Sequence, residues 1–265
     1  MSENLHGRGV IEPVKKQQVN WKICKETLLY LMFVKQKHCG KIKARGCADR
    51  RKQQEFISKE EASPPTVSIH VLMATSLIDA IKEKHVIMAD LPIAFLQADV
   101  VEDMWIKFEG EMVDVLIFIN KNLYRPCVCT YKKQQFLYTK AKKAVYGCLQ
   151  SALLFYKLLS DQLISWGFKM NPYDSFTINK LVEGSQLTIV FHVDDCKLSH
   201  LKTLWLRIWS TNCLINLGRK NPCQSPAERN MIILGGQWIT RRREKQNFTC
   251  TIMSSRFLVR HISDT

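Results

Sequence analysis

The sequence predicts an α+β fold with a largely antiparallel sheet. Beyond residue 66, the hydrophobic patterns follow the order helix, strand, helix, strand, strand. Two strand-like runs, 176–180 and 186–193, are separated by the turn-like segment LVEGS, which is typical of a hairpin. A second hairpin would carry Asp194 and Asp195 at its tip, with residues 196–199 as its returning strand.

The individual elements follow from hydrophobic periodicity along the chain. Residues 21–37 carry an apolar stripe and predict a helix, and SIHVLMATSLIDAIKEKH predicts another. VIMADLPIAF then reads as a short strand that Pro92 ends, and DMWIKF as the next strand. Between Gln150 and Gly167, apolar residues recur every three or four positions, which predicts a long helix with Gly167 as its C-cap.

The length, hydrophobic content and charge of the chain limit the kinds of protein and partner that fit it. The chain has 265 residues, 46% of them hydrophobic, so it can bury one large core or two smaller ones. Its formal charge of +15 favours a polyanionic partner, and either nucleic acid or an anionic membrane surface would fit. Apolar runs such as 28–34 are too short for a bilayer, and the polar start lacks a signal core. We therefore expect a soluble intracellular protein with reduced cysteines.

Basic residues are densest in the segment KQKHCGKIKARGCADRRKQQ. It holds eight lysines and arginines between Lys35 and Lys52, against the single acid Asp49. Such a run is either a solvated charged face or a surface for a polyanion. The segment ASPPTVS, at 62–68, disfavours regular structure and predicts a boundary.

Three aspartates predict a metal site. Asp90 ends a predicted buried strand, and Asp194 and Asp195 occupy a predicted turn much later in the chain. If the two strands are neighbours, these carboxylates converge at one edge of a sheet. Mg²⁺ prefers a few carboxylates together with substrate phosphates, and two such ions can support phosphoryl transfer. The alternatives are turn aspartates bonded to their own backbone and, for Asp90, a strand-end or helix-cap residue.

Three segments resemble the reverse transcriptase of copia-type retrotransposons, the RNA-directed DNA polymerase domain of the Pol polyprotein. They are ADLPIAFLQADVVEDMWIKFEGE (89–111), KKAVYGCLQSALLFYKLLSDQLISWGF (142–168) and FHVDDCKLSH (191–200), in the family's order. The resemblance covers roughly residues 7–200 and continues faintly in IILGGQW (232–238). It implies a right-hand polymerase palm and fingers with an antiparallel sheet, and a truncated or degenerate thumb. The implied regions are an N-terminal helix with basic fingers (1–65), the palm with interleaved fingers elements (66–200), and the degenerate palm end with the start of a thumb (201–265).

The resemblance assigns roles to individual residues. Asp90, Asp194 and Asp195 correspond to the catalytic aspartates, which would hold two Mg²⁺ ions, with Mn²⁺ as the alternative ion. Phe95 falls where related enzymes keep an aromatic ring that excludes a 2′-hydroxyl, and its alternative is a core phenylalanine.

Further residues are implied to bind the incoming deoxynucleoside triphosphate. Tyr146, Gly147 and Gln150 match the family's Tyr-Gly-x-x-Gln segment, in which the glycine would allow close approach of a nucleotide. The alternative is a turn glycine and a polar residue that begins the helix. Lys43 and Arg45 lie where the fingers strand reaches the triphosphate. The partners implied are an RNA template and a DNA primer, in a cytoplasmic particle or the nucleus.

Several positions depart from the family pattern. His192 replaces a tyrosine, Ile93 replaces a polar or small residue, and Arg50 replaces a frequent glycine. The pattern is lost between 203 and 229, and the chain ends before any recognisable RNase H segment. Two hypotheses follow: an RNA-directed DNA polymerase domain that works by two-metal phosphoryl transfer, or a truncated, inactive retroelement relic that at most binds nucleic acid. A metal-dependent nuclease is a third, less favoured class.

Overall fold

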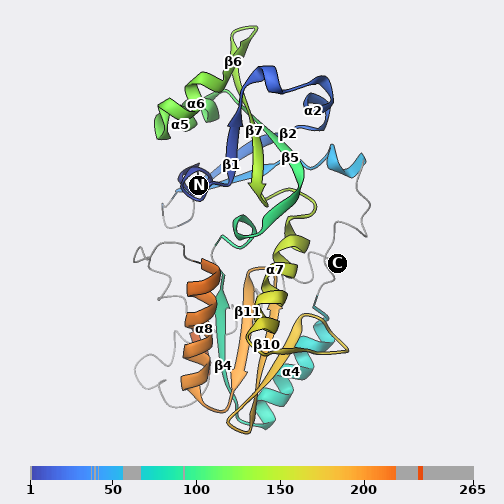
Figure 1. Cartoon of the computed structure of the whole chain (residues 1–265). Coiled ribbons are helices and arrows are strands. Elements are labelled where there is room, and N and C mark those ends of the chain that lie inside the picture. Colours follow the sequence, from blue (N-terminus) through green and yellow to red (C-terminus); the bar gives the residue numbers. More distant parts are fainter. Residues whose placement is uncertain are drawn as a thin grey trace. The chain divides into compact units, whose positions relative to one another are not determined.

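The chain folds into two compact units of mixed α and β structure, each built around a sheet that is mainly antiparallel (Figure 1). The computed structural model describes residues 2–36, 38, 40, 42–55, 67–91, 93–218 and 232–234. The units comprise Met1–Pro64 with Phe95–Leu158, and Pro65–Ala94 with Leu159–Thr265. The predicted α+β class is confirmed. The functional division into 1–65, 66–200 and 201–265 remains a prediction.

The sheet of the first unit has the strand order β1-β7-β5-β2-β3, with β6 also paired to β7. Neighbouring strands are antiparallel except for β2 and β5, which run parallel. The strands are β1 (Ile11–Val14), β2 (Leu28–Gln36), β3 (Ile42–Ala48), β5 (Asp99–Glu109), β6 (Val128–Tyr131) and β7 (Gln134–Lys143). The helices are α1 (Ser2–Gly7), α2 (Trp21–Glu26), α5 (Glu111–Ile119) and α6 (Lys121–Tyr124).

The prediction of a helix over residues 21–37 is correct for Trp21–Glu26, which form α2, and wrong for the residues after them. Asn20 caps α2 by accepting a hydrogen bond from Ile23 N at 2.9 Å, and the helix ends at Thr27, in extended backbone. The apolar run that follows suits a helix or a strand by composition alone. It forms β2 because β3 and β5 pair with it, which buries Leu28 and Tyr30.

The sheet of the second unit has the order β12-β4-β11-β10-β9-β8, and every neighbouring pair is antiparallel. Both predicted hairpins, the strand before Pro92 and the helix after residue 68 are confirmed. The strands are β4 (His85–Asp90), β8 (Lys169–Met170), β9 (Thr177–Val182), β10 (Ser185–His192), β11 (Asp195–His200) and β12 (Ile232–Leu234). The helices are α4 (Ile69–Ile81), α7 (Ser151–Ser165) and α8 (Thr203–Gly218).

The long helix predicted between 150 and 167 is α7, which both units share by sequence. Gly167 ends it in the left-handed region, with φ of 82°, as predicted. Its N–H donates to Ile164 O at 2.8 Å, and Phe168 N donates to Leu163 O at 3.1 Å. These two bonds satisfy carbonyls that the helix end would otherwise leave unpaired.

The two faces of the second sheet differ in polarity. One face carries fully buried apolar residues, including Ile87, Ile189 and Leu198, and α8 packs beside β11 and β4 (Figure 1). The opposite face carries Thr188 and Lys197 and contacts α4. This alternation follows from the two-residue period of a strand.

No described helix combines the length and the apolar composition that crossing a bilayer requires. The region predicted as the palm end and thumb, 201–265, lies outside the described residues from 219 onward, apart from 232–234.

Candidate functional site

The second unit brings the three predicted aspartates to one sheet edge. Asp90 is the last residue of β4, and Asp195 is the first of β11, directly opposite it in the antiparallel register. Asp194 occupies the two-residue turn between β10 and β11, and its carbonyl accepts a hydrogen bond from Leu91 N at 2.7 Å. Strand pairing thus brings three aspartates from distant parts of the sequence to the same edge of the sheet.

Cross-strand pairing sets the electrostatics of this edge. Residues directly opposite each other project to the same face, with Cβ atoms about 5 Å apart, and like charges in such a pair are destabilising. Asp90 is exposed and Asp195 is half-buried. Among the residues that the structure describes, no three His, Cys, Asp or Glu side chains gather as a ready-made metal cage. Two or three carboxylates, completed by water and substrate phosphates, nevertheless match the oxygen ligands that Mg²⁺ takes.

Backbone strain flanks the aspartates. Val193, immediately before Asp194, has φ of 54°, and Ile93, three residues after Asp90, has φ of 59°. For a β-branched residue a positive φ is a genuine outlier, and such conformations cost about 1–3 kcal/mol each. They are the β-branched residues with positive φ in the described chain; the other non-glycine examples are Glu83, Lys132, Lys133 and Glu183. Strain of this kind clusters at functional sites.

His192 extends the row of paired residues. It is the last residue of β10 and lies opposite Asp195, so His192, Asp195 and Asp90 succeed one another across three strands. The imidazole is buried. The position that departs from the family's tyrosine therefore directly adjoins the candidate metal site.

The first unit brings together the predicted aromatic residues. The rings of Phe95 and Tyr146 lie 4.7 Å apart between centroids, and Phe95 meets the edge of Phe155 at 6.4 Å. Phe95 and Tyr146 are both half-buried. Phe95 is thus neither a fully buried core residue nor an exposed ring, and its orientation is fixed by aromatic packing.

Gly147 is required by the backbone that surrounds it. Its φ is 94°, and a Cβ atom there would overlap the carbonyl oxygen of Ala48. Ala48 N also donates to Tyr146 O at 2.7 Å, which holds β3 against this turn. The close approach is made by the chain itself, and a nucleotide contact at Gly147 remains a prediction. The neighbouring Cys148 thiol is buried, which raises its pKa to about 12 and disfavours a nucleophilic role.

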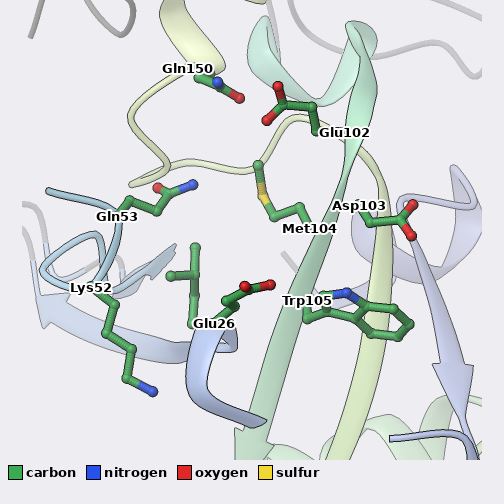
Figure 2. Close-up of a pocket in the computed structure, with 9 residues that line it drawn as sticks. Glu26, Lys52, Gln53, Glu102, Asp103, Met104, Trp105 and Gln150 are labelled. Atoms are coloured by element: carbon green, nitrogen blue, oxygen red, sulfur yellow. The ribbon is translucent and has the colours of Figure 1, made fainter. Parts of the chain in front are cut away.

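Gln150 immediately precedes α7 and lines a cavity. Its carbonyl accepts the first helical hydrogen bond, from Leu154 N at 2.9 Å, as expected for a residue at the helix start. Figure 2 shows its side chain directed toward Glu102, across a cavity of about 290 Å³ that Gln53 and Met104 also line. The remaining lining residues are Glu26, Leu28, Lys52, Asp103 and Trp105. With three acids and one lysine, this cavity disfavours a bare triphosphate.

Lys43 and Arg45 lie on an exposed two-stranded ribbon. In the β2–β3 register, Lys43 faces Lys35 and Arg45 faces Phe33, which places all four on one face. Each of these residues is exposed. One aromatic ring and three cations on one face of a ribbon suit a nucleic-acid backbone with an adjoining base.

The predicted residues therefore form two groups. The aspartates belong to the second unit, and Phe95, Tyr146, Gly147, Gln150, Lys43 and Arg45 belong to the first. The strained residue Val193 was not predicted as notable, although a non-glycine residue in a two-residue hairpin turn is a usable signal.

Comparison with known proteins adds no assignment. No family model matches the chain, and no curated protein matches it significantly.

Proposed function

We propose that this chain is a copia-type reverse transcriptase domain, an RNA-directed DNA polymerase with palm and fingers. The observation that carries the proposal is the pairing of Asp90 with Asp195, with Asp194 in the adjoining turn. Like charges directly opposite each other are destabilising, and a divalent ion of phosphoryl transfer bound at this edge would offset their repulsion. The flanking strain at Val193 and Ile93 gives independent support.

Asp90, Asp194 and Asp195 would hold two Mg²⁺ ions. When bound, such ions acidify an attacking hydroxyl and offset the charge of a triphosphate. In the proposed reaction, the primer 3′-oxygen attacks the α-phosphorus of a deoxynucleoside triphosphate. A phosphodiester forms and pyrophosphate leaves. Protein groups act mainly by positioning, as is general for phosphoryl transfer.

The first unit would recognise the nucleotide and the nucleic acid. Phe95, held by Tyr146 at 4.7 Å, would stand against the sugar and exclude a 2′-hydroxyl. Lys43 and Arg45 would neutralise phosphates from the β2–β3 ribbon, where arginine can bond two phosphate oxygens at once. The chain's formal charge of +15 suits an RNA template and a DNA primer, with binding that weakens steeply with salt.

One alternative draws on the same ribbon. A relic without turnover would retain the basic face of Lys35, Lys43 and Arg45 and still bind nucleic acid. Binding alone therefore does not discriminate between the two functions, and an assay of synthesis is needed.

Primer extension on an RNA template tests the proposal. The purified full chain is incubated with an RNA template, an annealed DNA primer, the four deoxynucleoside triphosphates and Mg²⁺. Extension to the template end supports the polymerase. Binding without extension leaves the relic. Metal-dependent cleavage of the template or primer without extension would instead support a nuclease.

A further inference from the structure

A buried polar layer separates α4 from the sheet of the second unit. Asp79, on α4, is 4% exposed and forms an ion pair with Lys197 of β11 at 2.8 Å. Lys84 approaches the other carboxylate oxygen at 3.7 Å, and its side chain is 5% exposed. Lys197 also donates to Ser76 Oγ at 2.9 Å. The carboxylate of Asp79 is thus shared by two buried ammonium groups.

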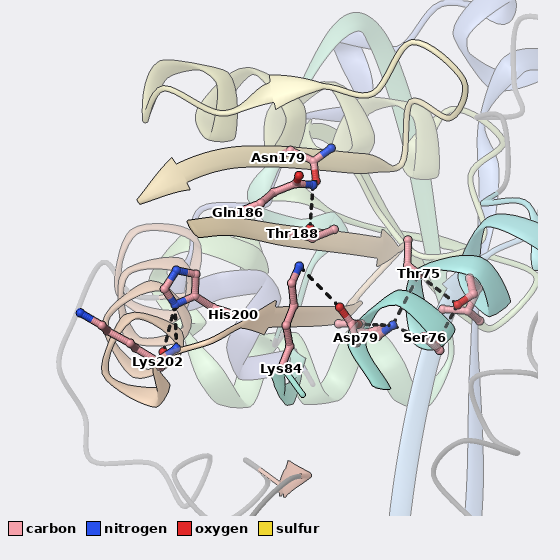
Figure 3. A network of polar contacts seen from close by, with 11 residues as sticks. Thr75, Ser76, Asp79, Lys84, Asn179, Gln186, Thr188, His200 and Lys202 are labelled. Carbon is pink, nitrogen blue, oxygen red and sulfur yellow. Dashed lines mark hydrogen bonds and ion pairs between the residues drawn. The ribbon is translucent and has the colours of Figure 1, made fainter. Parts of the chain in front are cut away.

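A cavity of about 180 Å³ opens beside this ion-pair cluster. It is far larger than the roughly 10–15 Å³ that one water needs. Lys84 is the residue immediately before β4, and Figure 3 shows its side chain directed toward Thr188 and Asp79. Thr177, Asn179 and Thr188 line it from strands β9 and β10.

The cavity lining is rich in donors. Thr177 is 1% exposed, and its Oγ1 has no hydrogen-bond partner. A buried hydroxyl left unpaired is costly, which indicates that the cavity normally supplies an acceptor. Thr188 Oγ1 accepts from Gln186 Nε2 at 3.2 Å, and that leaves its own proton to donate. Asn179 Oδ1 accepts from Gln186 at 2.6 Å, so its amino group can also donate.

The charge around the cavity is unbalanced. Lys82 and Lys84 line the cavity together with Asp79, and Lys197 forms an ion pair with the same Asp79 carboxylate. The pKa of Lys84 is lowered, first by burial and then by repulsion from Lys82 and Lys197, while Asp79 opposes the shift. An anion in the cavity would relieve this repulsion and accept from the unpaired hydroxyl.

We propose that the cavity between α4 and strands β9 and β10 binds a phosphate group. Its donors are Thr177 and Asn179 of β9, Thr188 of β10 and Lys84, which precedes β4, and together they need an acceptor with several oxygens. A tetrahedral oxyanion has more acceptor oxygens than a carboxylate. A metal cation is excluded by the ammonium groups. The site lies within the second unit and is independent of the proposed polymerase chemistry.

Titration with inorganic phosphate at constant ionic strength tests this site, with thermal unfolding and calorimetry of the full chain as readouts. Wild type should show saturable binding and a rise in Tm, whereas chloride alone should give neither. K84M should bind at least tenfold more weakly. K169M removes an exposed lysine of β8 in the same unit and should bind like wild type.

The variant T177V tests whether the cavity binds a ligand or is filled only by water. Valine removes the unpaired hydroxyl at similar volume, so T177V should unfold at a higher temperature without phosphate yet bind phosphate about tenfold more weakly. Glycerol phosphate shows which kind of phosphate the cavity accepts. If it binds as tightly as inorganic phosphate, the ligand is a phosphomonoester; if it binds more weakly, the ligand is free phosphate. The proposal is overturned if wild type shows no saturable binding, or if K84M and T177V both bind phosphate as wild type does.

Discussion

Asp195 lies directly opposite Asp90 across the antiparallel pair of β11 and β4. The turn before Asp195 is tied to the residue after Asp90, since Leu91 N donates to Asp194 O at 2.7 Å. This backbone bond ties the hairpin turn to the end of β4, so that the two aspartates are held at the same sheet edge. Its consequences can be measured on the folded protein before any assay of synthesis.

Relief of carboxylate repulsion should be visible in stability. In EDTA, D195N should raise the free energy of unfolding by about 0.5 kcal/mol, because it removes a like charge opposite Asp90. Mg²⁺ should raise the Tm of wild type and leave D195N unchanged. Chemical and thermal denaturation check both expectations. D161N, at an exposed position of α7, is the control and should respond to Mg²⁺ as wild type does.

Glycine at position 193 should stabilise the hairpin turn. Val193 has φ of 54°, and glycine adopts that region without steric cost. V193G should therefore raise the free energy of unfolding by about 1 kcal/mol, measured by denaturant titration. V101G is the control, since Val101 is exposed in a strand and its replacement should be mildly destabilising. A destabilised V193G would contradict the assigned strain.

A side chain at position 147 should be far more damaging than one at position 110. Both glycines have positive φ, but a Cβ at Gly147 meets Ala48, whereas one at Gly110 meets open space. G110A should cost about 1 kcal/mol from backbone strain alone, and G147A at least ~2 kcal/mol. Equal losses in denaturant titrations would show that the contact with Ala48 is unimportant.

The aromatic gate can be tested by sugar selectivity. F95A should increase ribonucleotide incorporation relative to deoxynucleotide by about tenfold or more, because the ring would no longer meet the 2′-hydroxyl. Single-nucleotide kcat/KM values with matched ribo- and deoxyribonucleotides measure the ratio. F118A, which removes an exposed ring of α5, should leave it unchanged. Unaltered discrimination in F95A would assign Phe95 to packing against Tyr146 alone.

Several elements of the second unit could be predicted from the sequence because short runs of neighbouring residues determine them. The hairpin at LVEGS, the helix ending at Gly167 and the strand ending before Pro92 each depend on neighbouring residues. The apolar run of residues 28–36 fits both a helix and a strand, and pairing with β3 and β5 makes it a strand.

The buried ion-pair cluster under α4 could not be predicted from the sequence. Asp79, Lys84 and Lys197 are ordinary charged residues in the sequence, and only folding joins them. The opposition of Asp90 and Asp195 depends in the same way on strand neighbourhood. The sequence predicted that these carboxylates converge if the strands are neighbours, because each follows a strand-like run, but it placed Asp195 in the turn and not at the start of β11. Lys197 gave only the weak signal of a lysine inside an apolar strand.

Single-nucleotide extension of a DNA primer on an RNA template tests the central claim most directly, with wild type, D90N and D161N compared across a Mg²⁺ titration. The proposed site predicts Mg²⁺-dependent extension by wild type and D161N, and a loss of at least about a thousandfold in D90N. Equal extension by D90N and wild type, or no extension by a wild-type protein that still binds the primer and template, would contradict it.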